Sequence, residues 1–119
     1  MERDTAHPEA NALDREDLMA RCMGNLEFAE RILGMFQERC GEDLAQLEAA
    51  AESGDVKQVA LLAHRLKGAS ANVAAPGMQA RAAEIEAAAR QEALAEIPAS
   101  LNELKQEWSR FTSEVSGLA

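Results

Sequence analysis

Apolar residues recur at steps of three and four along most of this chain, which is the spacing that gives an α-helix one buried face. The longest such stripe predicts one long helix, and its members are Leu26, Ala29, Leu33, Phe36, Cys40, Leu44, Leu47 and Ala51. The phase of the stripe continues through Gly41, so we expect this glycine to bend the helix rather than end it. Ser53 and Gly54 break the pattern and predict the end of the helix.

A short helix is predicted before this long helix, and two more follow it. Asp14 can cap the short helix, which carries Leu18, Met19 and Cys22, and Asp55 can cap a third helix that runs to about Val73. Pro76 suits the first turn of a fourth helix, because a helix needs no N–H at that position. The buried stripe of the fourth helix consists of Met78, Ala82, Ile85 and Ala89.

The last predicted helix has the most regular stripe. Its apolar residues are Ile97, Leu101, Leu104, Trp108, Phe111, Val115 and Leu118, a 4-3 alternation that is typical of a helical bundle. Pro98 cannot lie deep inside a regular helix, so we place the start of this helix after Pro98. Residues 91–97 are then expected to form a separate turn.

Four amphipathic helices with short connections can bury their stripes together as an antiparallel bundle. We therefore predict an all-α fold, an antiparallel four-helix bundle with a short additional N-terminal helix, in one domain over residues 13–119 after a polar tail at 1–12. Valine, isoleucine and threonine together number nine in 119 residues, too few for a sheet protein. The core is expected to take up the aromatic and methionine side chains Phe28, Phe36, Trp108, Phe111, Met19, Met23 and Met35.

Charge and composition exclude several classes of function. With 12 basic and 21 acidic residues the net charge is −9, so nucleic acid and anionic membrane are poor partners. The longest apolar run, Val59 to Ala63, is far shorter than the roughly 20 residues of a membrane span, and residues 1–12 do not resemble a signal peptide. We expect a cytoplasmic protein in which Cys22 and Cys40 are free thiols. The sequence contains no glycine-rich phosphate loop and therefore does not predict nucleotide binding.

The third helix carries an exposed histidine. At 100° per residue, Val59, Leu62, Leu66, Ala69 and Val73 lie within about 40° of the pole opposite His64 and form the core face. The neighbours of His64 on the outer face are small, namely Ala60, Gly68 and Ala71. Glycine inside a helix costs about 1 kcal/mol relative to alanine, so close approach of another molecule explains Gly68 better than local stability does.

Charge is unevenly distributed around this histidine. No acidic residue occurs from Val56 to Ala83, whereas Lys57, Arg65, Lys67 and Arg81 all lie there. An acidic protein with one positive window around an exposed imidazole is suited to an anion or an acidic partner. An exposed histidine without any function is the competing interpretation, and His7 in the tail is taken to be inert.

Residues 63–73, which read A-H-R-L-K-G-A-S-A-N-V, resemble the signature of histidine-containing phosphotransfer (HPt) domains. That signature has histidine, then leucine or isoleucine before lysine and glycine, then two small residues. The resemblance implies that His64 is the phosphoacceptor, which takes a phosphoryl group from a receiver-domain aspartate and passes it to another. It further implies that Lys67 neutralises the phosphoryl oxygens. Ala74 stands where many family members have glycine.

The family also implies a polar residue on the fourth helix that orients the imidazole, and Glu86 holds the matching position. An ordinary surface pair of Glu86 with Arg90 is the alternative. Partner docking is expected at Leu61, Arg65, Gly68 and Ala71. The partners implied are response-regulator receiver domains and a hybrid histidine kinase. We expect a monomer with no metal or cofactor of its own, because Mg²⁺ is supplied by the receiver.

Two alternatives from other classes remain open at this point. A helical adaptor without phosphotransfer could bind a kinase or a receiver and still retain His64 and Lys67. A histidine kinase dimerisation domain would require a nucleotide-binding domain, and the sequence contains none. The sequence does not identify the cognate proteins or the net direction of transfer.

Overall fold

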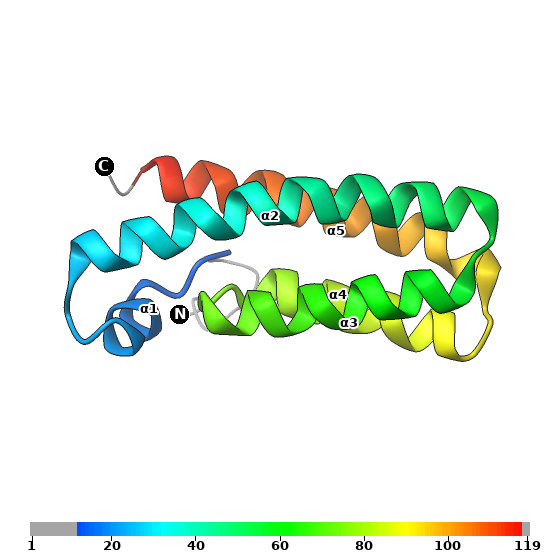
Figure 1. The fold of residues 1–119 in the computed structure, drawn as a ribbon, viewed down its shortest axis with the longest axis horizontal. Coiled ribbons are helices and arrows are strands. Elements are labelled where there is room, and N and C mark those ends of the chain that lie inside the picture. The colour runs from blue at the N-terminus through cyan, green and yellow to red at the C-terminus, as the bar shows by residue number, and fades with distance from the viewer. Residues whose placement is uncertain (1–11, 118–119) are drawn as a thin grey trace, which may run out of the picture.

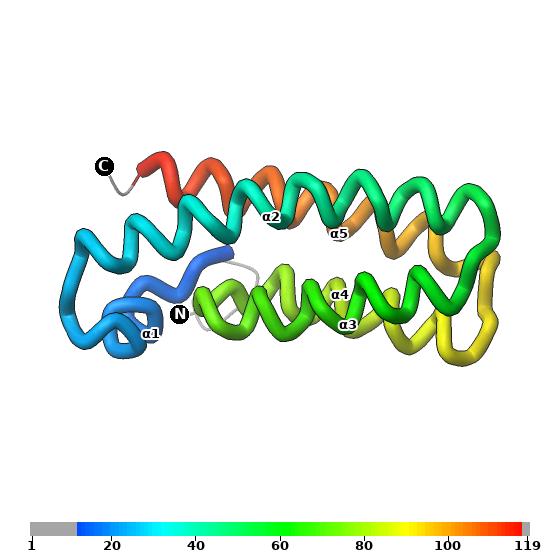
Figure 2. Tube along the Cα trace, in the orientation of Figure 1, coloured from blue at the N-terminus to red at the C-terminus, as the bar shows by residue number. Residues whose placement is uncertain are grey.

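A computed structural model describes residues 12–117, which form five α-helices and one short 3-10 helix. The elements are α1 (Arg15–Arg21), α2 (Leu26–Ser53), α3 (Val56–Asn72), α4 (Pro76–Arg90), η2 (Leu94–Glu96) and α5 (Ile97–Ser116). Figure 1 shows α2 beside α5 in one layer and α3 beside α4 in the other, with α1 at one end. Consecutive long helices run in opposite directions (Figure 2). The predicted all-α bundle with a short N-terminal helix is confirmed.

Helices begin where the sequence supplies a polar cap. The side chains of Asp14, Asn25 and Asp55 accept hydrogen bonds from the N–H groups three residues later, at 3.0, 3.0 and 3.2 Å. α2 passes through Gly41 without interruption and ends at Ser53, where Gly54 caps it with a left-handed φ of 76°. Caps and breakers thus fix the helix ends that the sequence predicts.

The start of the last helix differs from the prediction. α5 begins at Ile97, so Pro98 lies in its first turn rather than before it. Proline is tolerated there because the first N–H groups of a helix have no partner within the helix. The separate turn expected within residues 91–97 is present as η2, which ends one residue before α5 begins.

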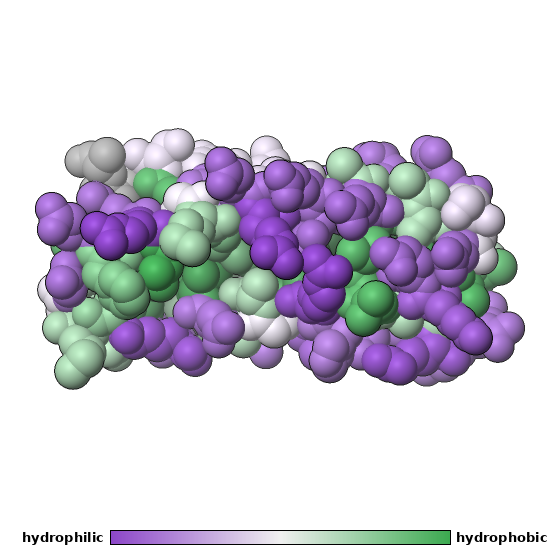
Figure 3. Space-filling view, viewed as in Figure 1, coloured by the Kyte–Doolittle hydropathy of each residue, from purple (hydrophilic) through white to green (hydrophobic). Residues whose placement is uncertain are grey.

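Most residues of the predicted stripes are buried, and in α2 these include Ala29 and Leu33, whereas Leu26 at the first residue of the helix is exposed. Phe36 and Phe111 are buried, and their rings pack edge to face with their centroids 5.3 Å apart. Trp108 is partly buried beside them. In contrast, large apolar side chains predicted to pack are exposed at Met23, Leu26, Phe28 and Met35. α2 has 28 residues against 17 in α3, and its first turns extend past the opposite layer (Figure 1). Apolar surface is correspondingly visible at that end of the molecule (Figure 3).

The chain before α1 is part of the core. Ala12, which we assigned to the tail, and Leu13 are buried, and their N–H groups donate to the carboxylate of Glu114 at 2.9 and 3.0 Å. The N–H of Asp14 donates to the carbonyl of Ala74 at 2.8 Å. These contacts join the segment before α1 to α5 and to the turn between α3 and α4. Residues 1–11, including His7, and Leu118 lie outside the described residues.

No helix within residues 12–117 is both long enough and apolar enough to cross a bilayer. The two cysteines are buried and free. Burial, with a smaller contribution from the nearby Asp43 carboxylate, raises the pKa of the Cys40 thiol to about 12. The Cys40 side chain therefore serves as an uncharged packing group.

Candidate functional site

His64 lies on the outer face of α3, at the middle of the helix. Its side chain is 59% exposed, whereas Val59, Leu62 and Leu66 on the opposite side are buried. This orientation agrees with the helical arithmetic. The His64 side chain therefore projects from α3 on the side away from the core.

The surroundings of the imidazole on α3 are sterically open. Gly68, one turn after His64, is exposed, and a Cβ added there would meet no atom within 4 Å. Ala71 is half-buried, and Leu61 is a large apolar side chain that is 51% exposed. The structure thus places the predicted docking residues on accessible surface near His64.

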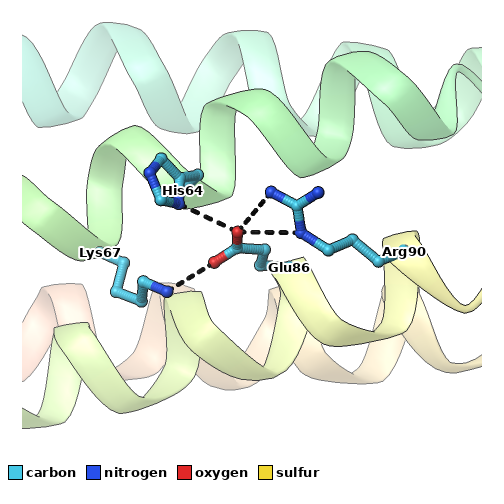
Figure 4. Close-up of polar contacts among 4 residues, drawn as sticks. All are labelled: His64, Lys67, Glu86 and Arg90. Atoms are coloured by element: carbon cyan, nitrogen blue, oxygen red, sulfur yellow. Dashed lines mark hydrogen bonds and ion pairs between the residues drawn. The ribbon is translucent and has the colours of Figure 1, made fainter.

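A carboxylate from the neighbouring helix holds the imidazole. The Nδ1 atom of His64 lies 3.0 Å from Oε2 of Glu86, a residue of α4 that is only 7% exposed (Figure 4). An ionised carboxylate can only accept a hydrogen bond, so Nδ1 carries the proton. In the neutral ring Nε2 is then unprotonated, and the other ring nitrogen points away from Glu86 in Figure 4.

Two cations share the same carboxylate. Lys67 Nζ lies 2.8 Å from Oε1 of Glu86, and Arg90 places Nη2 and Nε at 2.7 and 3.0 Å from Oε2. Glu86 therefore makes both the contact that the resemblance implied, with His64, and the alternative surface contact, with Arg90. Sequence reasoning treated these contacts as exclusive and gave Arg90 no part in the site. Its i+4 spacing from Glu86 was the available signal.

These donors keep Glu86 ionised although it is buried. The hydrogen bond from Lys67 has the largest effect, and those from Arg90 and His64 act in the same direction. Together they outweigh burial, which alone would raise the pKa, and lower the pKa of Glu86 to about 2. The Nδ1 proton of His64 thus faces a fixed negative charge.

Arg65 points toward another helix. Its Nη2 lies 3.5 Å from Oδ1 of Asp43, a buried carboxylate on α2, and Arg39 Nε lies 4.0 Å from the same oxygen. Arg65 was predicted as a docking residue, and this ion pair leaves it on the surface but tied to α2. Among the described residues, no group of three or more His, Cys, Asp or Glu side chains could hold a metal ion.

The fold and this geometry define a class: a helical bundle that presents, on its surface, a histidine oriented by a buried carboxylate. The family model described as the Hpt domain matches residues 31–114 of the chain, which include His64, Lys67 and Glu86. The chain belongs to the Hpt domain family. Domains of this family carry out histidine phosphotransfer in phosphorelays and interact with receiver domains and histidine kinases. No curated protein and no solved structure matched the chain.

Proposed function

We propose that this protein is a phosphocarrier whose His64 accepts a phosphoryl group from a receiver-domain aspartate and passes it to another receiver. The observation that carries the proposal is the contact between His64 Nδ1 and Glu86 Oε2 at 3.0 Å. This contact leaves Nε2 as an unprotonated nucleophile on an exposed side chain. An adaptor that only binds its partners has no need of an oriented imidazole.

The transfer needs no external base. Nε2 of His64 attacks the phosphorus of the aspartyl phosphate, and the breaking P–O bond leaves its electron pair on the receiver carboxylate. The proton at Nδ1 stays in place, so the ring becomes a phosphoimidazolium. In the onward step a second receiver carboxylate attacks phosphorus, and the P–N electron pair returns to Nε2.

Lys67 is the cation placed to balance the phosphoryl charge. Lys67 lies about one helical turn after His64, and its Nζ lies 2.8 Å from Oε1 of Glu86. Because the lysine side chain is flexible, a small rotation would bring Nζ to the transferred phosphoryl group. Magnesium would come from the receiver, whose own acidic residues hold it. The receiver would dock over Leu61, Gly68 and Ala71, with Arg65 at the edge.

We propose that the protein acts in the cytoplasm, where thiols such as Cys22 and Cys40 remain reduced. A hybrid histidine kinase is the proposed source of phosphoryl groups, through its receiver domain. The protein would act as a monomer, since one His64 face serves donor and acceptor in turn.

A transfer assay with phosphorylated receiver domains tests the proposal. Wild type should gain an acid-labile, alkali-stable label from at least one receiver in a panel, and ATP alone should give no label. His64→Ala should abolish the label with unchanged helicity by circular dichroism, whereas His7→Ala should have no effect. A label that survives in His64→Ala would refute the assignment, and binding without any label would favour the adaptor.

A further inference from the structure

The partner of the His64 ring is a carboxylate, although a neutral amide would be enough to orient it. A glutamine oxygen at position 86 could accept the same hydrogen bond from Nδ1 and select the same tautomer. A negative charge stabilises a positive charge on the ring more strongly than the neutral amide oxygen does. The charge of Glu86 therefore matters most in the state where the ring is a cation.

That state is the phosphorylated one. While Nδ1 keeps its proton, the phosphorylated ring is a cation, and cleavage of the P–N bond releases a neutral imidazole. If Nδ1 loses its proton, the same cleavage must release an imidazolate anion, which is a far stronger base and a poorer leaving group. The Nδ1 proton therefore controls how readily the phosphoryl group leaves.

We propose that the charge of Glu86 sets the lifetime of the phosphohistidine, by holding the Nδ1 proton on the phosphorylated ring at neutral pH. The carboxylate oxygen 3.0 Å from Nδ1 keeps the group ready for transfer and short-lived. This inference rests on the phosphocarrier function proposed above. It makes Glu86 a positioning residue that acts through His64 and does not itself touch the phosphoryl group.

The other charged groups near the ring strengthen the effect of losing Glu86. On α3 and α4 these are Lys67 and Arg90, both bonded to Glu86, and without its carboxylate two cations would face the imidazolium unopposed. On α2 the buried acid Asp43 is already paired with Arg65 and Arg39. Because the pKa of Glu86 is about 2, its carboxylate does not take up the proton itself.

Glu86→Gln separates charge from orientation, because the side chain keeps its shape and its acceptor oxygen. Wild type and variant are phosphorylated with phosphoramidate, and the ³¹P chemical shift of the phosphohistidine is followed against pH. Glu84→Gln is the matched control, since Glu84 is an exposed glutamate on α4 that pairs with Arg81. Removing an opposite charge at this distance should lower the titration midpoint of Glu86→Gln by about 1–3 pH units, with Glu84→Gln unchanged.

The half-life of the label follows from the same titration. At a pH above both measured midpoints, lowering the midpoint by one pH unit reduces the protonated fraction about tenfold. At such a pH the Glu86→Gln label should therefore decay about tenfold more slowly than the wild-type label for each unit by which the midpoint falls. Equal midpoints and half-lives in wild type and Glu86→Gln would overturn the inference. A lowered midpoint with no transfer from any receiver would instead overturn the phosphocarrier function alone, and absence of phosphoramidate label on His64 would overturn both.

Discussion

His64 and Glu86 are 22 residues apart in the chain, and the imidazole Nδ1 of the first lies 3.0 Å from the carboxylate Oε2 of the second. The short turn between α3 and α4 folds the two helices against each other and brings these residues together. The glutamate is buried and the histidine is exposed. The orienting group therefore acts from the protein side and leaves the solvent side of the ring free for a partner.

Replacing Lys67 should slow phosphotransfer more than replacing any other basic residue on α3. Loss of a charged contact worth about 1.5–3 kcal/mol predicts a decrease of roughly one to two orders of magnitude for Lys67→Ala. Arg65→Ala should have a smaller effect because Arg65 is directed toward Asp43 on α2, whereas Lys67 contacts the same carboxylate as His64. Exposed Lys57 provides a charge-matched control in Lys57→Ala. Rapid-quench rates with one receiver measure this. Equal rates for wild type and Lys67→Ala at low salt would show that its charge plays no part in transfer.

Gly68 should separate stability from docking. Gly68→Ala should raise the free energy of unfolding by about 0.5–1 kcal/mol, because the added methyl group meets no atom within 4 Å. Transfer should nevertheless fall progressively from glycine to alanine to glutamine, since each added atom stands between the ring and the receiver. Urea unfolding and transfer rates test the two effects, with Gly41→Gln on α2 as the control. If Gly68→Gln transfers at the wild-type rate, the partner does not dock here.

Gly77→Ala should lower the free energy of unfolding, whereas Gly68→Ala should raise it. Its missing side chain makes room for the buried carboxylate of Glu107, with which an added Cβ would collide. Displacing Glu107, whose other oxygen accepts a bond from Arg110 at 2.8 Å, should make Gly77→Ala less stable by about 1–3 kcal/mol. In a Glu107→Ala background the same substitution should no longer destabilise. Urea unfolding of the four proteins gives the coupling energy, and simple additivity would contradict the collision.

The acid stability of the bundle should depend on Glu86. The pKa of Glu86 is about 2 in the folded chain, below its ordinary value of 4.5, so the unfolded chain takes up this proton first as the pH falls. The stabilisation from ionised Glu86 is thus complete above about pH 5 and is lost between there and about pH 2. Wild type should exceed Glu86→Gln in stability at pH 6 and converge with it near pH 2. Urea unfolding across this range checks it, and a constant difference would contradict the assigned pKa.

Periodicity predicted the helices because each buried stripe follows from 3.6 residues per turn alone. The same arithmetic placed His64 outward and Gly68 beside it, since both belong to one helix. It could not predict that Leu26, a member of the stripe, is exposed at the first residue of α2. Phe28 is exposed because it lies about 200° around the helix from Leu26, on the outer face, which the arithmetic does predict.

Side-chain contacts between different helices could not be predicted from the spacing of residues in the sequence. The two interpretations of Glu86 could be decided only by the rotation of α4 against α3, which brings His64, Lys67 and Arg90 to one carboxylate. The pairing of Arg65 with Asp43 on α2 likewise depends on packing. Spacing in sequence predicts the face of one helix, whereas the register between two helices is set by the side chains that interlock.

The most direct test is to locate the phosphorus atom. The protein is labelled with ¹⁵N-histidine, incubated with a phosphorylated receiver domain, and examined for one-bond coupling between ³¹P and ¹⁵N. Because Nδ1 of His64 donates its hydrogen bond to Glu86, we predict coupling to Nε2 of His64 and to no other histidine nitrogen. Coupling to Nδ1 of His64, or phosphorus attached to any other residue, would contradict it.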